Sequence, residues 1–146
     1  MFEKTLVAGW GDMDFNSHMR NTAYLDKSAD VRMMYFSEHG FPMSEFMRLK
    51  IGPVVMKDEI EYHREIHLLN DIRVILSLAG LSEDGSRMRL RNDFYRNEKL
   101  AARVTSTAGW LDLDARKLTC PPEMLLAALR GLAKSDDFVT LPDSKS

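Results

Sequence analysis

The chain has 146 residues, of which 45% are hydrophobic and 29% are charged, and its formal net charge is -2. This composition is that of one globular domain; it excludes disordered and fibrous proteins, and the nearly balanced charge argues against a nucleic-acid partner. No apolar run is long enough to span a membrane, the lone Cys120 excludes an internal disulfide, and the sequence starts without a secretory signal, so we expect a cytoplasmic protein with no membrane partner.

The first part of the chain predicts a strand, a turn and a long helix. A β-like run over residues 3–10 ends at two nearby glycines. Residues 12–21 are rich in side chains that bond to their own backbone, which is typical of a structured turn before a helix. Residues 21–39 predict that helix, with Asn21 or Thr22 as its N-cap. Its apolar residues recur at helical spacing at Leu25, Ala29, Met33 and Phe36.

The second part of the chain predicts mostly strands. A short helix is expected over residues 43–49 and a closing helix over residues 123–133. Between them the alternation predicts strands around residues 59–64, 72–78, 88–94 and 100–113. Turn residues at 82–85 and 96–99 make the last three strands an antiparallel meander.

These elements predict an α+β fold in one domain over residues 1–133. The single long helix can bury its apolar stripe only against the strands that follow, so we expect an antiparallel sheet wrapped around that helix. Residues 134–146 are polar, and we expect them to form a flexible tail.

The turn contains a possible metal motif that fails on inspection. Asp12, Asp14 and Asn16 have the spacing of the first ligands of a calcium loop, but Ser17 stands where that loop needs glycine, and Ala23 where it needs glutamate. We therefore predict no metal site. Motifs for an activated serine or a phosphate-binding loop are also missing. From the residue types alone, the acids of this turn are best interpreted as turn and capping residues.

A family resemblance changes that interpretation. Residues 12–25, DMDFNSHMRNTAYL, resemble the opening motif of the 4-hydroxybenzoyl-CoA thioesterase-like branch of the hot-dog superfamily, in which an aspartate precedes a Gly-His-Val-Asn-Asn-like stretch, a tyrosine and the central helix. The helix adds matches at Ala29, Arg32 and Phe36. With residues 54–74 and 100–123, the resemblance covers residues 3 to about 130. The chain departs from the family pattern at Ser17 (usually glycine), Arg20 (asparagine) and Asn70 (glycine).

The resemblance implies an acyl-CoA thioesterase with Asp14 as its catalytic carboxylate. A carboxylate can attack the thioester carbon or take a proton from the attacking water, and both roles remain open. The start of the helix presents backbone N–H groups at Met19, Arg20 and Asn21, which could polarise the thioester oxygen. His18 matches the family histidine; assistance to catalysis and a loop histidine bonded to backbone are equally open.

The resemblance also implies partners and a substrate. The substrate is an acyl-CoA, so no separate cofactor is expected, and we expect Tyr24, Val54 and Tyr62 to contact it. From its residue type, Tyr24 is also interpreted as a structural aromatic that packs against the sheet with its hydroxyl hydrogen-bonded. Hot-dog relatives form one continuous sheet across two subunits, so we expect a homo-oligomer built on a dimer, either a homodimer or a homotetramer, in which residues 54–62 of the second subunit complete each pocket. Aryl, short and long acyl groups are all compatible with the sequence.

Three arginines alternate along one of the predicted strands. Arg87, Arg89 and Arg91 share one face of a strand, which we interpret as an outer solvated face, while binding of the coenzyme A phosphates is the alternative.

A hot-dog dehydratase acting on a hydroxyacyl thioester is the nearest enzymatic rival. A non-catalytic module that binds acyl thioesters is the rival from another class.

Overall fold

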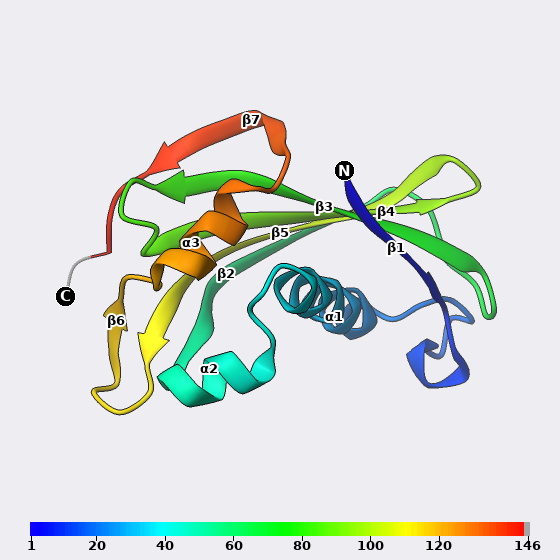
Figure 1. The fold of residues 1–146 in the computed structure, drawn as a ribbon. Helices are drawn as coiled ribbons and strands as arrows, with labels where there is room; N and C mark the ends of the chain where they lie inside the picture. The colour runs from blue at the N-terminus through cyan, green and yellow to red at the C-terminus, as the bar shows by residue number, and fades with distance from the viewer. Residues whose placement is uncertain (145–146) are drawn as a thin grey trace.

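Seven strands join into one sheet in the computed structural model, which describes residues 1–144 (Figure 1). The sheet order is β1-β3-β4-β5-β2, with β6 beside β5 and β7 beside β3. Every strand pair is antiparallel except β3 with β7. In chain order the elements are β1 (Phe2–Val7), the 3-10 helix η1 (Trp10–Asp12), α1 (Asn21–Glu38), α2 (Met43–Leu49), β2 (Ile51–Tyr62), β3 (Asp71–Ser82), β4 (Arg87–Arg96), β5 (Lys99–Asp112), β6 (Lys117–Thr119), α3 (Glu123–Arg130) and β7 (Lys134–Leu141).

The predicted antiparallel sheet is confirmed, including the meander of β3, β4 and β5. The described residues contain three α-helices, at the three places where helices were predicted, and α1 is the longest with 18 residues. That α1 is the one central helix of the fold stays a prediction. Figure 1 shows α1 lying against one side of the sheet. None of the helices within residues 1–144 combines the length and apolarity needed to cross a membrane.

Alternation along β3, β4 and β5 decides which face of the sheet is buried. In β4, for example, every second residue from Met88 to Phe94 is buried, and the residues between them are half-buried. Because successive side chains on a strand point to opposite faces, the sheet has an inner face toward α1 and an outer face. The inner face carries the larger buried side chains, among them Leu76, Leu78 and Val104.

The face of α1 that is buried differs from the predicted apolar stripe. Ala29, which we placed on the stripe, is exposed. The buried residues of the helix are instead Ala23, Tyr24, Ser28, Val31, Tyr35 and Phe36. Of the predicted stripe, Phe36 is buried, and Leu25 and Met33 are partly buried against the core. Apolar periodicity therefore found only part of the buried face, because polar atoms on the other buried residues weaken the hydrophobic signal.

A polar contact lies inside the interface between α1 and the sheet. Arg32 Nε donates to Asn92 Oδ1 at 2.8 Å, and Asn92 on β4 is fully buried. Burial lowers the pKa of Arg32 to about 10, although the nearby Asp58 carboxylate opposes the shift, so the guanidinium is still charged at neutral pH. Asp58 accepts a hydrogen bond from the buried Ser106 hydroxyl. Polar side chains therefore cross the inner face from β4 to β2.

Aromatic packing holds the far end of α1. The ring of Phe36 contacts the rings of Phe46 on α2 and Trp110 on β5, with centroids 6.0 and 5.9 Å apart. Phe46 stacks on Trp110 and meets Phe41 edge to face. Aromatic pairs of this kind add to the stabilisation from buried area. The cluster thus joins α1 and α2 to β5, which lies far from them in the chain.

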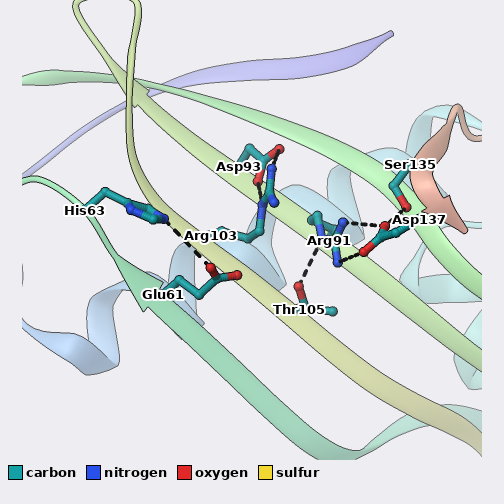
Figure 2. Close-up of polar contacts among 8 residues, drawn as sticks. All are labelled: Glu61, His63, Arg91, Asp93, Arg103, Thr105, Ser135 and Asp137. Atoms are coloured by element: carbon teal, nitrogen blue, oxygen red, sulfur yellow. Dashed lines mark hydrogen bonds and ion pairs between the residues drawn. The ribbon is translucent and has the colours of Figure 1, made fainter.

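The polar C-terminal segment is a strand, so the expected flexible tail is corrected for residues 134–141; residues 145–146 lie outside the described residues. β1 pairs with the first half of β3, and β7 pairs with the second half. Leu141 covers Gly80, where an added Cβ would lie 3.0 Å from the Leu141 Cγ. Arg91 donates two hydrogen bonds to Asp137, at 2.7 and 3.1 Å (Figure 2). These tertiary contacts order a segment whose own composition is polar.

The Arg91–Asp137 contact makes the attachment of β7 sensitive to acid. Hydrogen bonds from Arg91 and Ser135 hold the pKa of Asp137 well below its ordinary value. A depressed carboxyl pKa stabilises the folded state above the unfolded pKa, about 3.9 for aspartate, and the stabilisation is lost as the pH falls below that value toward the folded pKa.

We therefore expect Asp137→Asn to accelerate hydrogen exchange of the amides of residues 134–141 at pH 7 while changing the melting temperature little, because a local contact is lost and the core is unchanged. Asp136→Asn is the matched control, since Asp136 is exposed and has no hydrogen bond among the described residues. Equal exchange in the two variants would contradict the role given to Arg91 and Asp137.

Candidate active site

Asp14 lies in a closed turn between η1 and α1. Its N–H donates to the His18 carbonyl at 2.9 Å, and the Ser17 N–H donates to the Asp14 carbonyl at 3.2 Å. Asp14 Oδ1 also accepts from the Asn16 N–H at 2.8 Å, which fixes the orientation of the carboxylate. His18 Nδ1 lies 3.6 Å from Asp14 Oδ2 and 3.3 Å from the Met19 carbonyl oxygen. The turn therefore holds one carboxylate oxygen and leaves the second beside His18.

Backbone hydrogen bonds connect this turn to its neighbours and use two of the expected oxyanion donors. The Met19 N–H donates to the Ile66 carbonyl at 2.7 Å, and the Arg20 N–H donates to the Asp12 carbonyl at 2.9 Å. Both amides are thus occupied. Asn21, which we expected as the N-cap, is the first residue of α1; the N-cap is Arg20, and its side chain makes no capping bond.

The first amides of α1 differ from those of the turn. The N–H groups at the start of a helix have no carbonyl one turn earlier in the helix to bind. In residues 1–144, the N–H groups of Asn21 and Thr22 have no backbone acceptor. Of the three amides expected to face the thioester oxygen, the one at Asn21 is therefore available.

Asp12 supports the turn from the other side. Its carboxylate accepts from the Gly9 N–H at 2.8 Å and pairs with Lys27 at 2.9 Å. Burial disfavours ionisation of Asp12, but the hydrogen bonds and charge of Lys27, with the Gly9 N–H, outweigh burial and lower its pKa. Asp12 is thus a structural acid that ties η1 to α1, as interpreted from the sequence.

A cleft of about 530 Å³ opens beside Asp14. The predicted residues that line it are Asp14, His18, Met19, Asn21, Tyr24 and Tyr62. Arg20 and Val54 are not among its lining residues: Arg20 is exposed, and Val54 lies eight positions before Tyr62 on β2. The single chain therefore brings together six of the eight residues expected at the site.

Three lining residues were missed by the sequence analysis: His63, Arg64 and Glu65. They follow Tyr62 where the chain leaves β2. The N–H groups of His63 and Arg64 both donate to the Ala101 carbonyl, at 2.8 and 3.0 Å, which bends this segment toward the Asp14 turn. A signal was present, because three polar, ionisable residues directly follow a strand that the resemblance had assigned to the site, but alternation alone placed His63 on the strand.

Tyr24 forms the inner wall of the cleft. It is 2% exposed, and its ring meets Tyr62 and Phe94 edge to face, with centroids 5.4 and 5.3 Å apart. Burial, with smaller contributions from the charges of Tyr62, Asp14 and Glu65, raises the pKa of Tyr24 to about 12. The hydroxyl is therefore protonated at neutral pH.

The arginines of β4 lie on the outer face of the sheet, opposite α1. Arg89 Nε donates to Thr107, and Arg91 Nε donates to Thr105 (Figure 2 shows Arg91). Arg103 on β5 donates two hydrogen bonds to Asp93 on the same face. Arg89 and Arg91 are thus tied into contacts across neighbouring strands, and Arg91 is occupied by Asp137, whereas Arg87 Nε is buried without a hydrogen-bond partner among the described residues. These contacts favour a structural role on the outer face.

A family model described as the thioesterase-like superfamily matches residues 8–129, so the chain belongs to that family. The resemblance to hot-dog thioesterases is thereby confirmed. No curated protein sequence matches the chain significantly.

Several solved structures share the fold at low sequence identity. A gentisyl-coenzyme A thioesterase is 16% identical with a TM-score of 0.79, covering 88% of this chain and 99% of its own. A 1,4-dihydroxy-2-naphthoyl-CoA thioesterase from Synechocystis is 15% identical with a TM-score of 0.79, covering 90% and 96%. A Staphylococcus aureus protein solved in complex with CoA is 20% identical with a TM-score of 0.80, covering 97% and 89%.

The Asp14 turn contains a strained residue. Ser17, which replaces the usual glycine, has a φ of 67°, a left-handed conformation that favours glycine. We expect Ser17→Gly to stabilise the protein by about 1 kcal/mol, a rise in melting temperature of roughly 2–4 °C. Ser17→Ala is the control, because alanine carries the same steric restriction. If both variants changed the melting temperature alike, strain at this position would not be the cause.

Proposed function

We propose that the protein hydrolyses an acyl-CoA thioester to a free acid and coenzyme A. The observation that carries this proposal is the oriented Asp14 carboxylate, which shares a cleft with the start of α1, where the Asn21 N–H is free to donate. Membership of the thioesterase-like superfamily supports it. Further support comes from the fold shared with two aryl-CoA thioesterases and with a protein that binds CoA.

The chemistry follows two routes that the arrangement supports equally. In the first, Asp14 takes a proton from water as the water oxygen attacks the thioester carbon. In the second, an Asp14 oxygen attacks the carbon itself, and water then hydrolyses the resulting anhydride. In both, the C–S bond breaks, the electron pair leaves on the coenzyme A sulfur, and the thiolate takes up a proton. Neither route uses a metal or a bound cofactor.

Negative charge develops on the thioester oxygen in either route. The Asn21 N–H lies at the positive end of α1, so it can donate to that oxygen and stabilise the charge. His18 lies beside Asp14 Oδ2 and beside the Met19 carbonyl. We place it next to the reacting groups, where it either holds the carboxylate or assists the departing thiolate.

Asp14→Asn should remove most of the turnover while leaving the fold intact, because the shape is kept and the negative charge is lost. Loss of a general base costs on the order of 10²- to 10⁴-fold in rate. The measurement is release of free thiol from a panel of acyl-CoA substrates.

Asp12→Asn is the matched control for Asp14→Asn. It should lower the melting temperature, because a half-buried ion pair with Lys27 is weakened, and it should change the rate less. A fully active Asp14→Asn variant would exclude the proposed role of Asp14. Inactivity of the wild type on the whole panel would favour the binding module instead.

We further propose that the active form is a homo-oligomer built on a dimer through β2. β2 has 12 residues and lies at an edge of the sheet, and its side chains at Val55, Met56 and Tyr62 are exposed. A long edge with apolar side chains invites pairing, and a two-fold contact with a second copy covers it. The partner's Val54 and neighbouring β2 residues would then approach the cleft, which accounts for their absence from it in one chain.

Val55→Lys should shift the protein toward monomers in equilibrium sedimentation and reduce its activity in parallel, because a charge is placed on the proposed interface. Val7→Lys is the matched control: Val7 and Val55 are both 49% exposed, and Val7 lies on β1 at the opposite edge. A monomeric wild type with full activity on dilution would refute the shared site.

A further inference from the structure

Tyr24 and Asn21 lie on the same side of α1, because they are three residues apart in the helix. Side chains on a helix lean toward its N-terminus, so a helical residue covers the turn that precedes it. The ring of Tyr24 therefore extends back over the start of α1. Tyr24 and Asn21 both line the cleft beside Asp14.

The Tyr24 hydroxyl has no hydrogen-bond partner within the described part of the chain, residues 1–144, whereas the equally buried tyrosine on the same helix has one. Tyr35 is also 2% exposed, and its hydroxyl donates to the Ala128 carbonyl at 2.6 Å. A buried tyrosine hydroxyl normally finds a partner. The Tyr24 hydroxyl instead belongs to the wall of a cleft that is open to a ligand.

Packing around the Tyr24 ring holds its hydroxyl in one position. Tyr62 and Phe94 hold it edge to face on two sides. Its hydroxyl keeps its proton at neutral pH, because burial raises the Tyr24 pKa to about 12, with the charges of Asp14 and Glu65 acting in the same direction. Tyr24 therefore presents a fixed O–H donor at neutral pH, in the same cleft that Asp14 lines.

We propose that the Tyr24 O–H is a second donor to the thioester oxygen, acting together with the Asn21 N–H. The inference rests on the proposed thioesterase function. As the nucleophile attacks, the carbonyl electron pair moves onto oxygen, and the two donors stabilise the oxyanion without transferring a proton. When the C–S bond breaks, the carbonyl re-forms and the hydrogen bonds weaken. Preorganised donors of this kind act mainly on the transition state.

The test is Tyr24→Phe, which keeps the ring and removes the hydroxyl. We expect kcat to fall on the order of 10²-fold with KM changed by no more than a few-fold, because the donor acts on charge that develops during the reaction. The melting temperature should be unchanged or slightly higher, since no protein hydrogen bond among the described residues is lost.

Tyr35→Phe is the matched control and should show the opposite pattern: a lower melting temperature, because the Ala128 carbonyl loses its donor, and an unchanged kcat. A Tyr24→Phe variant with wild-type kcat overturns the inference, and so does a rise in KM with kcat unchanged, which would make Tyr24 a ground-state contact. The Asp14→Asn variant separates the two proposals. If it is inactive while Tyr24→Phe has wild-type kcat, the proposed function stands and the inference about Tyr24 fails. A wild type inactive on every acyl-CoA overturns both.

Discussion

The burial of α1 against the inner face of the sheet is the constraint on which the rest of the molecule depends. Its far end is held by the aromatic cluster around Phe36 and Trp110, and its start is held by backbone hydrogen bonds from Met19 to Ile66 and from Arg20 to Asp12. Fixing both ends of a helix fixes the direction of its first N–H groups. The Asp14 turn is closed by the same backbone network, so the carboxylate and the helix start keep one relative position.

The polar groups around the cleft are of two kinds. The amides of the turn are consumed by the fold, while the Asn21 amide and the Tyr24 hydroxyl are left without partners in residues 1–144. Both groups border the open cleft, so a ligand bound there can accept hydrogen bonds from them. The strained Ser17 belongs to the same pattern, since local strain is tolerated at sites whose geometry is needed for function.

Sequence patterns predicted what depends on local chemistry and missed what depends on distant contacts. Alternation predicted the meander, and the motif around Asp14 predicted most of the cleft. The buried face of α1 was predicted only in part, because Tyr24 and Tyr35 are buried despite their polar hydroxyls. β7 was missed because Arg91, on another strand, orders it. His63 to Glu65 were missed because the bend that turns them toward the cleft is made by Ala101.

The hydrogen bond from Arg32 to Asn92 has a consequence for how the site can vary. Apolar contacts between a helix and a sheet have no preferred direction, so they alone permit a helix to roll about its axis. A buried hydrogen bond does have a direction, and it opposes that rotation from a point three turns along α1. Side chains along the cleft can therefore be exchanged for others of different size while the roll angle is kept. In the proposed thioesterase, the acyl group that fits the cleft could then change while Asp14 and the start of α1 keep their alignment.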